Sequence, residues 1–147
     1  MKIDLIAGAR PNFVKIAAVI HAIENSKSNI EYRLIHTGQH YDEALSGSFF
    51  KDLELPEPDI NLGTGSGSQA EQTAAIMIAY EKVLQKGKPD LCLVVGDVTS
   101  SMACAVTAKK MQVKVAHVEA GIRSNDWSMP EEVNRVLIDS VADYFFT

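Results

Sequence analysis

"KIDLIAGARPNFVKIAAVIHAI", residues 2–23, joins two hydrophobic patterns that together indicate an α/β protein. Its first six residues are mainly apolar, as in a buried strand, and Gly8 opens a turn directly after them. From Phe13 to Ile23 the apolar side chains recur with the spacing of one helical face. The stretch therefore predicts a strand over residues 2–7, a short turn and an amphipathic helix.

The same alternation of strand and helix continues along the chain. Further apolar runs typical of strands occur at 32–37, 59–62, 91–96, 114–119 and 143–147. Between most of these runs lie segments of helical period, and the best marked covers residues 69–86, where Ser68 and Glu71 fit a capping box. Strands that alternate with helices indicate right-handed crossovers. We therefore predict a Rossmann-like, doubly wound parallel sheet in the order 3-2-1-4-5-6.

The composition is that of a globular protein of one domain. The chain has 147 residues, of which 46% are hydrophobic and 22% charged, and its net charge is −5. No apolar run approaches the roughly 20 residues that span a bilayer, which excludes a membrane protein, and the acidic balance disfavours nucleic acid as a partner. The start is typical of a strand and not of a signal peptide, and Cys92 and Cys104 lie in apolar contexts typical of reduced core thiols. These features predict a cytoplasmic location.

Charged residues follow three of the predicted strands. Arg10 comes after the first strand, Asp97 after the fourth and Glu119 after the fifth. Because ligands of open parallel sheets bind beyond the carboxyl ends of the strands, we expect these side chains at one edge. The Gly-containing turn before the first helix, with Arg10 and Lys15 near it, suits an anion such as phosphate. The alternative is an ordinary strand-to-helix turn with solvated cations.

Each acidic residue of this region also has a purely structural interpretation. Asp97 could cap the helix that follows it or could be a phosphoacceptor, and Ser128 with Glu131 forms a second capping-box pattern. Capping does not explain Glu119, whose carboxylate we expect to be partly desolvated at the end of an apolar strand. His117 lies within that strand pattern and is predicted to be a hydrogen-bonded core residue. No His, Cys, Asp or Glu set has the spacing of a metal site, so no metal is predicted.

Five blocks of the sequence carry a resemblance to a known family. In this order and spacing, GARPNFVK, TGQHYD, VVGDVTSS, HVEAGIRS and PEEVNR resemble the N-terminal domain of the non-hydrolysing UDP-N-acetylglucosamine 2-epimerases. The resemblance covers essentially all 147 residues. It implies the N-terminal half of a GT-B type fold, in which two Rossmann-like domains face a cleft, and an enzyme that is usually a homodimer.

The activity implied by the resemblance is the interconversion of UDP-N-acetylglucosamine and UDP-N-acetylmannosamine for polysaccharide biosynthesis. The family acts by eliminating UDP to give a 2-acetamidoglucal and adding it back with a proton delivered to the other face of C2, without a nicotinamide or other cofactor. By position, the resemblance implies acid–base roles for Asp97, Glu119 and Glu131. The residues predicted to bind the substrate are Arg10, Lys15 and Arg135.

Two departures from the family pattern carry expectations of their own. Residues 1–147 are predicted to be a single Rossmann-like domain that lacks the family's C-terminal nucleotide-binding domain and its further catalytic His. We expect little or no epimerase activity from this domain by itself. In addition, Gln39-His40 is followed by Tyr41-Asp42 and not by a basic residue, which argues against activation by the substrate.

Three other functions remain open on the sequence. A hydrolysing epimerase would share the fold, although we expect a first loop without an Arg10-Pro11 pair in that class. A GT-B glycosyltransferase domain usually needs one base, whereas three candidate carboxylates are present here. The third alternative is a sugar-nucleotide-binding domain without catalysis.

Overall fold

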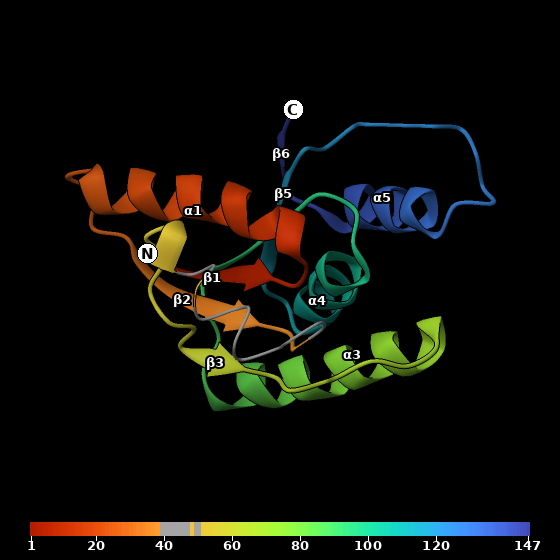
Figure 1. Ribbon diagram of the computed structural model, residues 1–147, viewed down its shortest axis with the longest axis horizontal. Helices are drawn as coiled ribbons and strands as arrows, with labels where there is room; N and C mark the ends of the chain where they lie inside the picture. The colour runs from red at the N-terminus through yellow and green to blue at the C-terminus, as the bar shows by residue number, and fades with distance from the viewer. Residues whose placement is uncertain (39–47, 49–50) are drawn as a thin grey trace.

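A six-stranded parallel sheet forms the centre of the computed structural model, which describes residues 1–38, 48 and 51–147 (Figure 1). Its strands are β1 (Lys2–Ala7), β2 (Glu31–His36), β3 (Ile60–Asn61), β4 (Leu91–Val95), β5 (Lys114–Val118) and β6 (Tyr144–Phe146). The helices that position the candidate site are α1 (Arg10–Asn25), α3 (Gln69–Lys86), α4 (Thr99–Lys110) and α5 (Pro130–Val141). The strand order is β3-β2-β1-β4-β5-β6, which confirms the predicted doubly wound topology.

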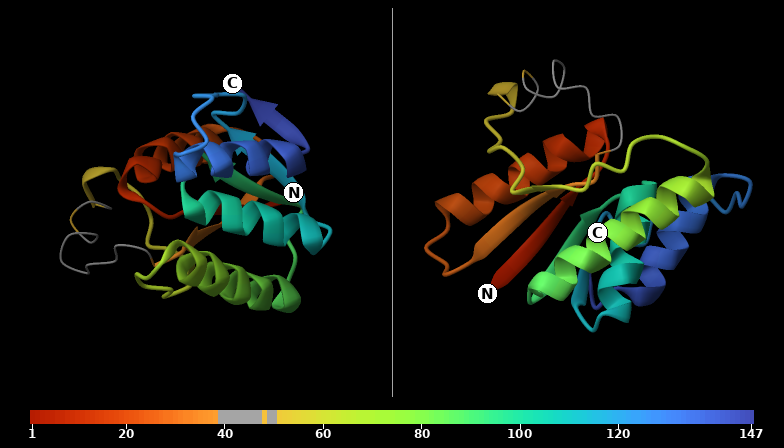
Figure 2. Two further views of the ribbon diagram at one scale, coloured as in Figure 1. Left: turned by 90° about the vertical axis from the view of Figure 1, so that its right-hand side faces the viewer. Right: turned by 90° about the horizontal axis from the view of Figure 1, so that it is seen from below.

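Helices cover both faces of the sheet. Helices α3, α4 and α5 lie side by side on one face, and α1 lies on the other (Figure 2). Alternate residues of β1 point to opposite faces. Leu5 therefore packs in the cluster that contains Phe13 and Ile16 of α1, whereas Ile6 packs in the cluster that contains Ile76 and Tyr80 of α3. Among the described helices, none is both long and apolar enough to cross a membrane.

Several element boundaries agree with the sequence prediction to the residue. Strand β1 covers residues 2–7, and α3 begins at Gln69 and ends at Lys86. The capping box at the start of α3 is formed in full, because the Ser68 hydroxyl accepts a hydrogen bond from the Glu71 N–H at 3.1 Å and the Glu71 carboxylate accepts one from the Ser68 N–H at 3.1 Å. Both termini of this helix are specified by local contacts.

Strand β6 differs from the prediction in its burial. The stretch 143–147 forms a parallel strand beside β5 as expected, but Tyr144, Phe145 and Phe146 are 45%, 54% and 54% exposed. The prediction of a buried strand is therefore wrong for this segment. The physical reason is its position at the edge of the sheet, where the described helices leave its aromatic side chains uncovered.

Both cysteines occupy the core, as predicted. Cys92 lies on β4 and Cys104 on α4, and both are buried free thiols. Burial raises the pKa of the Cys92 thiol to about 12 and that of Cys104 well above its usual range. These thiols are therefore packing groups and not nucleophiles.

Candidate active site

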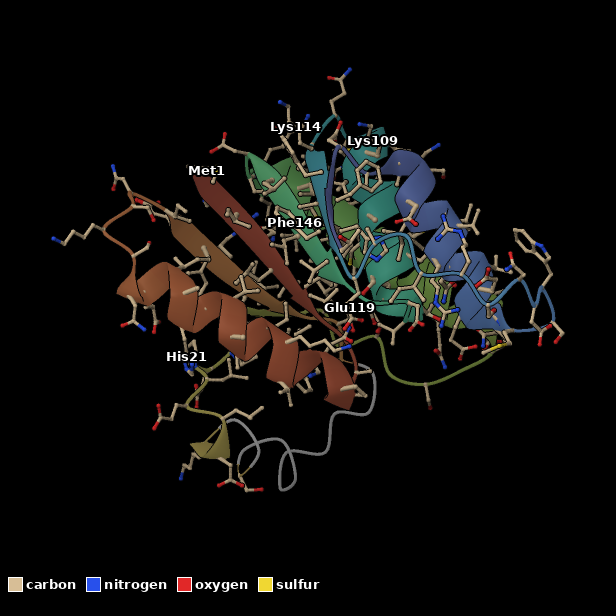
Figure 3. All side chains as sticks on the ribbon, turned by 90° about the horizontal axis from the view of Figure 1, so that it is seen from above. Met1, His21, Lys109, Lys114, Glu119 and Phe146 are labelled. Atoms are coloured by element: carbon tan, nitrogen blue, oxygen red, sulfur yellow. The ribbon has the colours of Figure 1, made fainter. Side chains whose placement is uncertain are left out.

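The candidate site lies at the edge of the sheet where the parallel strands have their carboxyl ends. Figure 3 shows Glu119 at this edge, opposite the edge that carries Met1 and Lys114. Helices α1 and α4 begin here, and their N-cap residues, Ala9 and Val98, make no side-chain capping bond. The positive ends of these two helix dipoles therefore point to this edge, where they favour an anionic ligand.

Glu119 forms an ion pair with Lys15 from the second turn of α1. Lys15 Nζ lies 2.5 Å from Glu119 Oε1, and the two side chains are 40% and 37% exposed, so the expected partial desolvation of Glu119 is confirmed. The backbone of Glu119 has φ = +69°, a left-handed conformation that is unfavourable for a residue with a Cβ. Its N–H and that of Ala120 both donate to the Phe146 carbonyl, which fixes this turn against β6.

Gly96 follows β4 and lies next to the Glu119 side chain. It has φ = +70°, and a Cβ at this position would lie 3.4 Å from Glu119 Oε2. The neighbouring strand end is held by Asn12, a buried residue of α1 whose Nδ2 donates to the Val95 carbonyl at 3.2 Å. The positive φ therefore favours glycine at this position, whereas a Cβ would make only ordinary van der Waals contacts.

Asp97 belongs to a second ionic cluster, with Arg135 and Glu132 of α5. Arg135 Nε and Nη2 donate to Asp97 Oδ2 at 3.0 and 2.6 Å, and Nη1 donates to Glu132 Oε2 at 2.8 Å. The predicted helix cap at Asp97 is therefore wrong: α4 has Val98 as its N-cap, and the Asp97 carboxylate turns towards Arg135 instead. The cluster joins the end of β4 to α5.

Glu132 is the buried member of this cluster. It accepts hydrogen bonds from the N–H and hydroxyl of Ser124, both at 3.0 Å, and from the Asn125 N–H at 3.2 Å. The hydrogen bond from the Ser124 N–H has the largest effect on its pKa and, with the bond from Arg135, outweighs desolvation and lowers the pKa to about 2. A buried carboxylate thus holds the loop before α5 and orients Arg135.

Glu131 lies apart from both clusters. It is exposed on the first turn of α5, and within the described part of the chain its side chain forms no hydrogen bond or ion pair. The predicted capping box at Ser128 is wrong, because the N-cap is Met129 and the Ser128 hydroxyl donates to Asp126 Oδ1 at 2.6 Å.

The side chain of Arg10 and residues 39–42 are outside the described residues.

His117 is a hydrogen-bonded core residue, as predicted. Its ring is fully buried, with Nδ1 2.6 Å from Asp139 Oδ1 and Nε2 2.8 Å from the Gly96 carbonyl.

The sequence interpretation missed Asp139 and the role of Glu132, since neither follows a strand. The available signal was their place on the inner face of the helix over 130–141. Among the described residues, no group of three His, Cys, Asp or Glu side chains could hold a metal ion.

The sequence was compared with known families. The sequence model of the family described as UDP-N-acetylglucosamine 2-epimerase matches residues 21–147. This chain belongs to that family. The match includes Asp97 and Glu119, which follow β4 and β5, and the helix that carries Glu131 and Arg135.

Curated relatives and solved structures agree with this assignment. The chain is 49% identical, over 99% of its length, to a UDP-N-acetylglucosamine 2-epimerase of Methanocaldococcus jannaschii. It is 43% identical to a UDP-2,3-diacetamido-2,3-dideoxy-D-glucuronate 2-epimerase of Pseudomonas aeruginosa. A crystal structure of the Methanocaldococcus jannaschii UDP-GlcNAc 2-epimerase in complex with UDP-GlcNAc and UDP matches with a TM-score of 0.94 and 48% identity, over 100% of this chain and 40% of that chain. The chain covers 39% and 41% of the two curated relatives, so it spans about two fifths of their length.

Proposed function

We propose that this chain is the acid–base domain of a non-hydrolysing UDP-N-acetylglucosamine 2-epimerase, completed by a second, nucleotide-binding domain that corresponds to the remaining length of the relatives. Membership of the family supports the reaction class. The observation that carries the proposal is the Glu119–Lys15 pair: a half-exposed carboxylate, held in a left-handed turn, faces a cation at the carboxyl edge of the sheet. Substrates of this fold bind at that edge.

The proposed chemistry begins with the departure of the diphosphate. Hydrogen at C2 of the resting sugar is not acidic, so loss of UDP from C1 must develop positive charge there first. Cations and the positive end of a helix dipole near the phosphates stabilise the leaving group. Lys15, Arg10 and the uncapped start of α1 are the groups of this chain proposed to contact the substrate or its diphosphate.

Proton transfer at C2 is proposed to use more than one carboxylate, because inversion needs access to both faces of the sugar. Glu119 is the candidate base that the geometry favours most, since it is exposed to a ligand and lies beside a single cation. Asp97 receives both of its bonds from Arg135 on one oxygen, Oδ2. Glu131 extends into solvent from α5 and would join the site when a substrate lies across the edge.

The test is exchange of solvent deuterium into C2 by the two-domain enzyme. We expect UDP-N-acetylmannosamine labelled at C2, and we expect Glu119→Gln to lower the exchange rate by about 10²- to 10⁴-fold. Glu81→Gln, which changes an exposed glutamate of α3, is the matched control and should retain full activity. Turnover without deuterium at C2 contradicts the proton-transfer mechanism. Release of free N-acetylmannosamine and UDP would identify a hydrolysing enzyme instead.

Two further measurements define the proposal. The 147-residue chain alone is expected to show no measurable turnover, because the proposed nucleotide-binding domain is needed to hold UDP. UDP-2,3-diacetamido-2,3-dideoxy-D-glucuronate is the second substrate to assay, because a relative 43% identical is named as the 2-epimerase of that sugar nucleotide.

A homodimer and a cytoplasmic location remain part of the proposal. The cytoplasmic location is supported by the unpaired Cys92 and Cys104.

A further inference from the structure

An Asp–His pair, in which the His is fully buried and the Asp is partly buried, contacts the turn that carries Glu119. Asp139 of α5 contacts His117 Nδ1 through Oδ1 at 2.6 Å. Its other oxygen, Oδ2, accepts a hydrogen bond from the Gly121 N–H at 3.0 Å and lies 2.7 Å from Arg123 Nη1. The chemistry proposed above uses neither residue of the pair, although every group that Asp139 contacts belongs to the segment around Glu119.

The contacts of this pair reach two glycines next to Glu119, Gly96 and Gly121. On one side, His117 Nε2 lies 2.8 Å from the carbonyl of Gly96, the residue that approaches Glu119 Oε2. On the other side, Asp139 holds the N–H of Gly121, two residues after Glu119. A left-handed non-glycine residue persists only where its surroundings hold it in place. The pair supplies part of that support.

The geometry also assigns the Nε2 proton of His117. The Gly96 carbonyl can only accept a hydrogen bond, so Nε2 carries a proton. Burial opposes ionisation of Asp139, but hydrogen bonds from His117, Arg123 and the Gly121 N–H outweigh burial and keep its pKa below the usual range. The Asp139 carboxylate is therefore an acceptor, and the His117 ring lies between this carboxylate and the Gly96 carbonyl.

We propose that Asp139 and His117 are positioning residues for the Glu119 carboxylate: through Gly96 on one side and Gly121 on the other, the pair fixes the turn that aims Glu119 at the substrate. The inference rests on the proposed function of Glu119 as the base. Displacement of a catalytic group by about 1 Å can cost about 10²-fold in rate. Loss of the Asp139 contacts should therefore lower the rate, although Asp139 does not touch the substrate.

The first test uses the chain itself. Nitrogen-15 NMR of the 147-residue chain should show a hydrogen-bonded proton on His117 Nε2, which faces the Gly96 carbonyl. Asp139→Asn weakens the contacts of this side chain with the His117 ring and the Gly121 N–H, so the ring signals of His117 and the amide signals of Glu119 and Gly121 should shift. Asp143→Asn is the matched control, because Asp143 makes the same kind of contacts at the other end of β5, with Lys109 and the Val115 N–H. It should leave the His117 ring unchanged.

The second test uses the two-domain enzyme. Asp139→Asn should lower kcat for C2 exchange by up to about 10²-fold with KM changed less than about twofold, whereas Asp143→Asn should retain kcat. In a Glu119→Gln background, Asp139→Asn should cause no additional loss, because a residue that acts through Glu119 has nothing left to position. A general loss of stability would instead add to the Glu119→Gln effect.

The outcomes separate this inference from the proposed function. Absence of the His117 Nε2 proton in the unchanged chain, unaltered Glu119 and Gly121 amide signals in Asp139→Asn, an unaltered kcat in Asp139→Asn, or additive losses in the double variant would each overturn the positioning role. Absence of C2 exchange in the unchanged enzyme contradicts the proposed function instead. The ring signals of His117 and the Glu119 and Gly121 amides of the chain then decide whether the pair holds the turn. If Asp139→Asn does not fold, the His117 Nε2 proton of the unchanged chain still decides the geometry.

Discussion

Two carboxylates of this sheet show how the same charge serves a scaffold in one place and a candidate active site in another. Asp4, in the middle of β1, is completely buried and accepts hydrogen bonds from Arg33 Nε at 2.7 Å, Arg33 Nη2 at 2.9 Å and the Tyr80 hydroxyl at 2.9 Å. Glu119, after β5, is 37% exposed and pairs with Lys15 alone in its ionic contacts among the described residues. A fully satisfied carboxylate binds nothing else, whereas a half-exposed one is available to a ligand.

The backbone conformations of Asp4 and Glu119 differ as well. Asp4 lies in regular strand and its neighbours on either side are paired to β2. Glu119 lies just beyond a strand, in the left-handed conformation, with its turn held by contacts from α5 and β6. Strained residues cluster at functional sites because the surrounding structure must supply the energy that holds them. The comparison therefore makes different predictions for stability at the two positions.

Breaking the Asp4 network should have the largest effect on stability. Asp4→Asn leaves the Arg33 guanidinium, itself only 18% exposed, without its anion, and we expect a loss of about 3 kcal/mol in the free energy of unfolding. Urea unfolding followed by circular dichroism measures it. Tyr80→Phe removes one hydrogen bond from the same carboxylate and should cost about 1 kcal/mol. A smaller loss in Asp4→Asn than in Tyr80→Phe would contradict the assignment of Asp4 as the centre of the network.

Glu132 extends the comparison to acid pH. Its pKa is about 2 in the folded chain and about 4.5 in an ordinary setting, so its ionised form stabilises the fold fully above pH 4.5, and this contribution is lost as the pH falls towards 2. The free energy of unfolding of the unchanged chain should therefore fall more steeply over this window than that of Glu132→Gln. Glu131→Gln, next to it but exposed, should follow the unchanged chain. Parallel curves for the chain and Glu132→Gln would refute the buried network.

The smallest effect is expected at Glu119 itself. Because φ is +69° there, Glu119→Gly should be about 1 kcal/mol more stable than Glu119→Ala, since glycine adopts the left-handed conformation without a Cβ clash. Glu81, inside α3, is the control with the opposite sign: Glu81→Gly should be about 1 kcal/mol less stable than Glu81→Ala. Thermal and urea unfolding of the four variants measure both differences. If the alanine variant is more stable than the glycine variant at both positions, the backbone of Glu119 is not strained.

The two capping-box patterns explain why some of the structure could be predicted and some could not. Ser68 and Glu71 form the box because no other strong partner competes for the Ser68 hydroxyl in the described loop before α3. Ser128 and Glu131 have the same spacing, yet the Ser128 hydroxyl bonds to Asp126 and α5 starts at Pro130 without a side-chain cap. A local pattern predicts structure only where the rest of the loop does not offer the same atom a better partner.

The sequence by itself determined the strand order, the ends of β1 and α3, and the edge at which Asp97, Glu119 and Lys15 lie, because hydrophobic periodicity and the right-handed crossover act within short segments. Only the tertiary structure decided which ions pair. Glu131 and Glu132 are adjacent and chemically alike, but the packing of α5 turns one into solvent and buries the other against Arg135. The exposure of β6 and the contacts of His117 and Asp139 with the glycines beside Glu119 likewise depend on elements far apart in the chain, which no local pattern records.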